Sequence, residues 1–116
     1  MQLNDEEHER NTEVIRNLND CFRRTFQGGR VVMTSGVQGL GEEGISALVR
    51  MVQNAPASDP ANDPYQENDF GAIEYGQSKY FWKIDYYDRN LQYHSEDPAN
   101  QKQTVRVLTI MRADEY

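Results

Sequence analysis

The sequence predicts an α+β protein in which two helices lie on one face of a mostly antiparallel four-stranded sheet. Two stretches carry apolar residues at helical spacing, and four other stretches are rich in β-branched and aromatic residues. The resulting order is α-β-α-β-β-β. One sheet with both helices on the same face is the simplest arrangement that buries the two helical stripes.

The composition is that of a single globular domain covering residues 1–116. The chain is 37% hydrophobic and 27% charged, which is typical of a folded protein. Its apolar runs fall far short of the roughly 20 residues of a membrane helix, and its acidic beginning does not fit a signal peptide. The single cysteine excludes an internal disulfide and a cysteine zinc cluster. We therefore expect a cytoplasmic protein without a cofactor.

The net charge limits the class of partner. Direct binding of DNA or RNA depends on lysine and arginine side chains that neutralise phosphates, and a formal charge of −7 argues against it. The same charge keeps a protein soluble and suits a protein partner with a basic surface.

The first half of the chain predicts helix, strand and helix. Asn4 is a candidate N-cap, and Gly28-Gly29 ends the first helix. Its apolar stripe consists of Val14, Ile15, Leu18, Cys21, Phe22 and Phe26. On this stripe we expect Cys21 to be a small buried residue rather than a nucleophile. A strand at 30–35 follows, and the second helical stripe consists of Ile45, Leu48, Val49 and Val52.

A glycine pattern lies between the predicted strand and the second helix. Gly39, Gly41 and Gly44 match G-x-G-x-x-G, the pattern of a dinucleotide-binding loop. However, Glu42 and Glu43 would lie where a pyrophosphate needs positive potential, and the chain is too short for two βαβ halves. We therefore interpret the pattern as turn glycines.

The second half predicts a hairpin and a final strand. The hairpin strands are 69–75 and 79–87, joined at Gly76-Gln77-Ser78, and the final strand, 104–112, is apolar enough for an inner position. Long loops at 54–68 and 92–103 separate these elements. In the second hairpin strand, Trp82 shares a face with Tyr80, Ile84 and Tyr86. We expect that face to be the core, with Phe81, Lys83, Asp85 and Tyr87 on the other.

The functional signal is concentrated in 62–88. This segment holds six acidic residues and two lysines, a net charge of −4, and nine of the twelve aromatic residues lie between Tyr65 and Tyr93. Because a two-layer fold hides one face of its sheet, surplus tyrosines suit a binding surface. The alternative is that aromatic residues simply favour strands. The candidate binding residues are Asp63, Tyr65, Glu67, Asp69, Tyr75, Asp85, Tyr87 and Asp88.

The acidic loop raises a second possibility. Asp63, Glu67 and Asp69, with Asp59 and Asp85 further away, offer hard oxygen ligands for Mg²⁺, Mn²⁺ or Ca²⁺. A metal-dependent hydrolase or nuclease is therefore the rival hypothesis. The structural explanation is that the Asp and Asn side chains hold the loop through local bonds to the backbone. We assign no metal ligand and no catalytic residue.

Several motifs resemble a family of small bacterial proteins of unknown function, found mainly in proteobacteria. The resemblance runs from about Asn19 to Tyr116 and is carried by NDPxxExDFG at 62–71, WKIDYYD at 82–88 and RVLTIM at 106–111. In that family the position of Asn68 is often histidine, so a catalytic histidine ligand would be missing here. The resemblance implies no activity. The hypothesis we carry forward is a non-catalytic acidic protein that binds a macromolecule, such as an inhibitor of a nucleic-acid-handling enzyme of the anti-CRISPR or antirestriction type.

Overall fold

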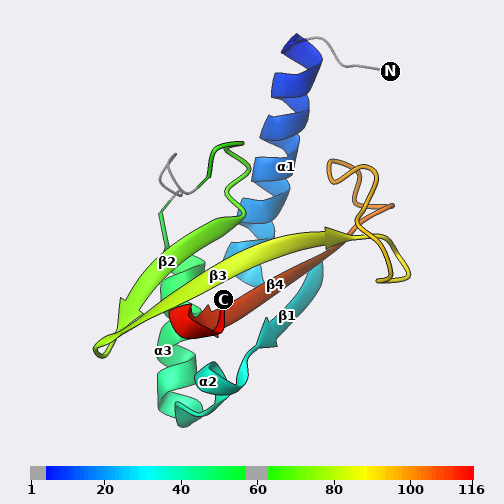
Figure 1. Cartoon of the computed structure of the whole chain (residues 1–116). Helices are drawn as coiled ribbons and strands as arrows, with labels where there is room; N and C mark the ends of the chain where they lie inside the picture. The colour runs from blue at the N-terminus through cyan, green and yellow to red at the C-terminus, as the bar shows by residue number, and fades with distance from the viewer. Residues whose placement is uncertain (1–4, 57–62) are drawn as a thin grey trace.

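The protein is a twisted sheet with its long helices on one face (Figure 1). A computed structural model describes residues 5–56 and 63–116. In chain order the elements are α1 (Asp5–Thr25), β1 (Gly29–Met33), α2 (Ser35–Gln38), α3 (Gly41–Asn54), β2 (Phe70–Tyr75), β3 (Ser78–Tyr87), β4 (Val105–Arg112) and the 3-10 turn η1 (Ala113–Glu115). The predicted α+β class is confirmed.

The four strands lie in the order β1-β4-β3-β2. β4 pairs antiparallel with β3 and parallel with β1, and β3 pairs antiparallel with β2. The last strand is therefore an inner strand, as its apolar sequence predicts. The parallel β1–β4 pair makes the sheet mixed.

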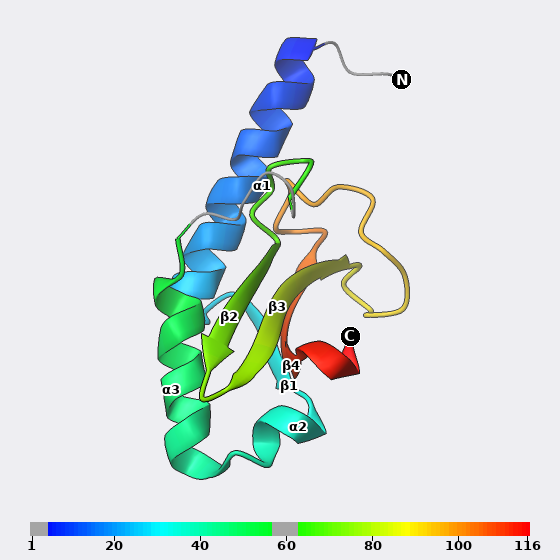
Figure 2. The ribbon, with the colours of Figure 1, turned by 60° about the vertical axis from the view of Figure 1, so that its left-hand side comes forward.

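The two long helices pack on the same face of the sheet, which we call the inner face. Figure 2 shows α1 and α3 on one side of the strands and η1 on the other. The first turns of α1 extend past the end of the sheet in both views (Figures 1 and 2). None of the helices in 5–56 and 63–116 has the length and apolar character needed to cross a bilayer.

The predicted face of β3 forms the core. Tyr80, Trp82, Ile84 and Tyr86 are all at most 7% exposed, and they pack with Leu108 and Ile110 of β4. Gly71 of β2 lies opposite Trp82, where any Cβ would collide with the indole ring. This close approach explains why a glycine follows Phe70.

The predicted stripe of α1 is partly wrong. Cys21 and Val14 are exposed, whereas Asn19 and Arg23 are buried beside Phe22. The helix turns these two polar side chains toward the sheet because the interior offers partners for both. Arg23 donates Nη1 hydrogen bonds to the carbonyls of Val52 (2.7 Å) and Ala55 (2.9 Å) at the C-terminal end of α3. Its guanidinium also lies over the Trp82 ring, 5.1 Å from the centroid.

The region after β1 also differs from the prediction. The strand ends at Met33, and Ser35 begins the short helix α2 instead of ending the strand. Glu115 holds this junction, accepting hydrogen bonds from the Thr34 hydroxyl (2.6 Å) and the Gly36 N–H (2.9 Å). The glycine pattern therefore follows a helix rather than a strand, and Gly41 has a φ of +78° in the turn into α3. The turn interpretation fits this geometry.

Candidate functional site

The loop before β2 is organised by Asp63. Its carboxylate accepts hydrogen bonds from the backbone N–H groups of Glu67 (3.1 Å) and Asn68 (2.7 Å), and its carbonyl accepts one from the Gln66 N–H (3.0 Å). These bonds support Gln66 and Asn68 at φ values of 57° and 54°, a left-handed conformation that most residues avoid. Asp63 is only 5% exposed. It therefore builds the loop, as the structural explanation predicts, and does not offer its carboxylate to a partner.

Two side chains of α1 fasten this loop to the helix. Arg16 donates a hydrogen bond from Nη1 to the Gln66 carbonyl (3.0 Å). The buried Asn68 amide donates to Asp20, which also lies 3.7 Å from Arg23. Asn68 thus contacts α1 in this chain.

Glu67 belongs to a buried polar chain that crosses the interior. The Tyr86 hydroxyl donates to Glu67 Oε1 (2.7 Å), and Asn19 Nδ2 donates to the Tyr86 oxygen (2.7 Å) and to the Glu67 carbonyl (3.0 Å). Asn19 Oδ1 in turn accepts from Arg106 Nε (2.7 Å). Burial, and then the bond to Glu67, raise the pKa of the Tyr86 phenol. The tyrosine therefore stays neutral and acts as a donor.

Asp69 lies where the loop meets the hairpin. Burial, together with the nearby carboxylates of Glu67, Asp63 and Asp85, raises the pKa of its carboxyl to about 6. No lysine or arginine in the described ranges, 5–56 and 63–116, forms an ion pair with it. Asp69 is therefore a half-buried acid without a cation.

A hollow of about 320 Å³ lies where the loop enters β2; Asp69 borders it, and Phe70, Lys83 and Asp85 of its lining belong to the outer face of the sheet. We call it the acidic hollow; its lining residues are Asp69, Phe70, Lys83, Ile84, Asp85 and Tyr116. Tyr116 packs edge-on against Phe70 and Phe81, with ring centroids 5.8 Å and 5.6 Å away. Lys83 and Asp85 form an ion pair at 3.2 Å, with both side chains more than one-third exposed. Aromatic rings and carboxylates thus meet at one place.

The other predicted residues lie elsewhere. Tyr65 is 74% exposed and borders a separate hollow with residues of α1. Tyr75 packs against the core on the inner face, so the expectation that it belongs to an outer aromatic surface is wrong. Tyr87 is half-buried on the outer face, and its backbone forms an antiparallel β-bridge with His94. Asp88 accepts hydrogen bonds from the N–H groups of Asn90 and Gln92 and so shapes the turn after β3.

The tyrosine surplus is also smaller than the sequence suggests. Tyr80 and Tyr86 are core residues, as the face predicted for β3 implies, and Asn19 gives the Tyr86 phenol a polar partner in the interior. Conversely, the reasoning from sequence overlooked Asn19, Arg106 and Tyr116. The first two had a detectable signal: Asn19 lies on the Ile15–Phe22 side of α1, and Arg106 alternates with Leu108 and Ile110 along β4.

The described residues contain no group of three or more His, Cys, Asp or Glu side chains that could hold a metal ion. Asp63 is already saturated by backbone donors, and Glu67 is bound to Tyr86. Asp59, the remaining candidate ligand, lies outside the described residues. No observation here favours the metal-dependent hydrolase over an interaction role.

Residues 33–115 match the family model described as a protein of unknown function (DUF3768). The chain belongs to this family. The DUF3768 match includes all the lining residues of the acidic hollow except Tyr116. It does not include α1, which supplies Asn19, Asp20 and Arg23 to the site. No curated protein and no solved structure matches the chain. Function must therefore be inferred from the site.

Proposed function

We propose that this DUF3768 protein is a non-catalytic interaction module that binds a basic protein partner at the acidic hollow. The observation that supports this most is Asp69, half-buried among three other carboxylates and paired with no described cation. A positive side chain placed there would relieve the repulsion between like charges that raises the pKa of Asp69. The acidic hollow therefore favours a lysine or arginine side chain of the partner.

The aromatic rings beside the hollow suit the same ligand. Phe70 and Tyr116 border the space next to Asp69 and Asp85. A guanidinium or ammonium group gains from an aromatic face as well as from a carboxylate, and aromatic residues are enriched in the buried centres of interfaces. The Lys83–Asp85 pair is exposed enough for a competing cation to displace Lys83 at little cost.

We further propose that the partner is a bacterial enzyme that handles nucleic acids. Such enzymes present basic surfaces to phosphates, and a protein with a net charge of −7 can offer carboxylates in their place. This would make the protein a cytoplasmic inhibitor of the anti-CRISPR or antirestriction type. The bacterial origin rests on the resemblance of its motifs.

The test compares two variants that lose the same charge. Asp69→Asn/Asp85→Asn removes both carboxylates of the acidic hollow, and Glu42→Gln/Glu43→Gln removes two exposed carboxylates from α3. Each tagged protein is used to capture basic proteins from a bacterial lysate, and the association rate of any captured partner is then measured at low and high salt. We expect the first variant to associate at least tenfold more slowly at low salt, with the difference shrinking at high salt.

Equal capture by the two variants would contradict the proposal, because the effect would then follow net charge and not this hollow. Tight binding of one divalent ion per chain by calorimetry, abolished by Asp69→Asn, would instead favour the metal hypothesis.

A further inference from the structure

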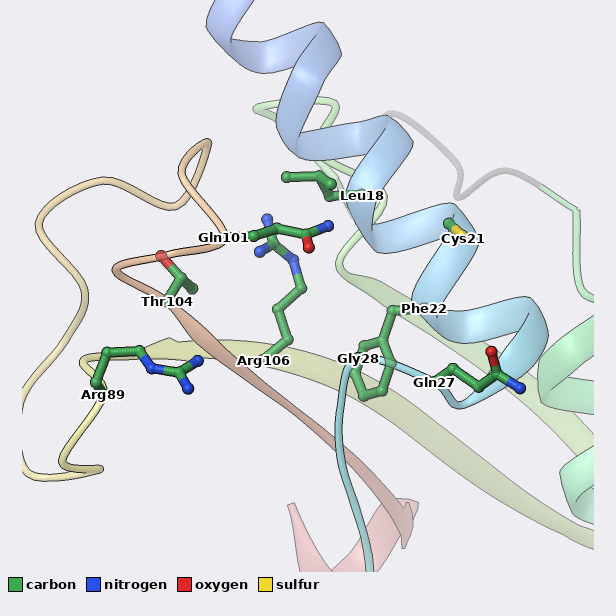
Figure 3. A pocket seen from close by; sticks show the side chains of 9 residues that line it. All are labelled: Leu18, Cys21, Phe22, Gln27, Gly28, Arg89, Gln101, Thr104 and Arg106. Carbon is green, nitrogen blue, oxygen red and sulfur yellow. The ribbon is translucent and has the colours of Figure 1, made fainter.

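A second pocket lies on the inner side of the molecule, between the C-terminal half of α1 and the loops that flank β4 (Figure 3). Its volume is about 140 Å³, and we call it the arginine pocket; it is lined by Leu18, Cys21, Phe22, Gln27, Gly28, Arg89, Gln101, Thr104 and Arg106. The lining contains two arginines and no carboxylate. In a chain with a net charge of −7, such a lining is unexpected.

Arg106 is the more buried of the two cations, at 3% exposure. It reaches from β4 toward α1, as Figure 3 shows, and is held by neutral acceptors only. Nε donates to Asn19 Oδ1 (2.7 Å), Nη2 donates to the Pro98 carbonyl (2.6 Å), and the guanidinium lies 5.2 Å from the Tyr86 ring centroid. No carboxylate among the described residues forms an ion pair with it.

An arginine held in this way is a prepared anion receptor. Buried charges in proteins are ordinarily paired, because removing a cation from water is costly. Two of the three nitrogens of Arg106 are fixed by the fold, whereas Nη1 donates to no described residue. Burial lowers the pKa of Arg106, and the charge of Glu67, which lies beyond Asn19 and Tyr86, offsets this only in part.

Arg89 adds a second set of donors to the same space, and Thr104 forms part of its wall. Arg89 is exposed on the loop after β3 and forms no ion pair with a described residue. The buried Thr104 hydroxyl donates to the Asp97 carbonyl (2.9 Å) and lies 2.7 Å from Ser95 Oγ, so its position is fixed. One buried and one exposed guanidinium can therefore contact a ligand in this space.

We propose that the arginine pocket binds a small oxyanion, a phosphate or carboxylate group, between Arg106 and Arg89. Guanidinium groups bind these planar or tetrahedral anions through paired, charge-assisted hydrogen bonds. A volume of about 140 Å³ is close to the roughly 150 Å³ of a cavity that holds one benzene molecule, so the pocket has room for such a group. The pocket lies apart from the acidic hollow and shares no residue with it.

The oxyanion could be a free ion or a group on another molecule, and the experiment separates these sources. Inorganic phosphate, a phosphoserine peptide and a short peptide with a free C-terminal carboxylate are titrated into the full chain at constant ionic strength in chloride. Binding is followed by calorimetry and by the amide NMR shifts of Gly28 and Thr104. Cys21, the only cysteine, borders the pocket, so its rate of alkylation is a third readout.

We expect at least one probe to bind with one site per chain, to shift both amides and to slow the alkylation of Cys21. Arg89→Gln should weaken this binding about tenfold, the usual weight of a lost charge-assisted hydrogen bond. The matched control, Arg50→Gln, removes an exposed arginine of α3 that does not line the pocket and should leave binding unchanged. Arg106→Lys, which keeps the charge but not the forked donor, should also weaken it.

The proposal is overturned if none of the three probes binds saturably, or if Arg89→Gln and Arg50→Gln weaken binding equally. Because Arg89 is exposed, its replacement tests the pocket even if Arg106→Lys fails to fold.

Discussion

The acidic hollow and the arginine pocket each contain a charged side chain at least half removed from water, Asp69 and Arg106, that forms no ion pair with a described residue. They differ in what surrounds that charge. Arg106 is held by an amide oxygen, a carbonyl and an aromatic ring, all of which favour a cation. Asp69 is surrounded by carboxylates, which disfavour its ionised form. The cation is thus supported by its surroundings and the anion is opposed by them, so a bound counter-ion would relieve more repulsion at the acidic hollow.

A chain of hydrogen bonds runs from Arg106 of the arginine pocket to Glu67, whose carboxylate lies near Asp69. Asn19 contacts Arg106 at one end, and Tyr86 contacts Glu67 at the other. Neutral groups therefore separate the basic and acidic sites inside a small protein. Substitutions that affect one face of the sheet, or one site, and spare the other test this difference between the two regions.

The largest effect is expected on the inner face of the sheet. Trp82 is 1% exposed, and Trp82→Ala should lower the free energy of unfolding by roughly 3–5 kcal/mol. Phe81, its neighbour on the outer face, is half-buried, and Phe81→Ala should cost only about 1–2 kcal/mol. Urea denaturation measures both. Equal losses would mean that the outer aromatic cluster is as much a core as the inner one.

A smaller effect is expected from breaking the polar chain. Tyr86→Phe removes the hydroxyl that bonds Glu67 and Asn19, so the buried Asn19 amide and the half-buried Glu67 carboxylate each lose a partner, and should cost about 1–3 kcal/mol. Tyr87→Phe is the matched control on the outer face and should change stability by no more than about 0.5 kcal/mol. The same denaturation experiment serves here. If Tyr86→Phe were as mild as the control, the buried chain would contribute nothing to stability.

The smallest effect concerns the pH dependence of Asp69. Its pKa rises from 3.8 to about 6 on folding, so the folded state holds this proton more tightly than the unfolded chain. Ionising Asp69 therefore lowers stability above about pH 6, and the loss disappears as the pH falls from 6 toward 4. Asp69→Asn should be more stable than the wild type at pH 8, by on the order of 1 kcal/mol after allowing for solvent screening.

Thermal unfolding at pH 8 and pH 4 checks this expectation, with Glu42→Gln as the control for an exposed carboxylate. A variant less stable than the wild type at pH 8 would show that the Asp69 carboxylate is favoured in the folded state, against the account given above.

The sequence predicts the elements better than the partners of their side chains. Alternation identified the inner face of β3, and the apolar run of β4 identified its inner position, because both can be recognised within a single strand. The same reasoning misplaced Cys21, since the choice between neighbouring faces of α1 depends on Tyr86 and Arg106, which lie far away in the chain. Hydropathy alone favours burying Cys21 over Asn19.

The candidate site was predicted in the same uneven way. Asp69 and Asp85 are near each other, as the hairpin implies. Tyr75, in contrast, faces inward, because it alternates along β2 in phase with Gly71 and Ile73. The role of Asp63 in the loop followed from a known preference of Asp side chains for nearby backbone N–H groups. The ring contacts of Tyr116 join the chain terminus to β2 and β3, and no local pattern reports such a contact.

The most direct test of the central claim is an NMR titration of the Asp69 side-chain carboxyl, with and without a lysine- and arginine-rich peptide. We expect a pKa of about 6 in the free protein and a clear decrease when the peptide binds. An ordinary pKa near 3.8 in the free protein, or a raised value that the peptide leaves unchanged, would contradict the claim that the acidic hollow is a site for a cationic partner.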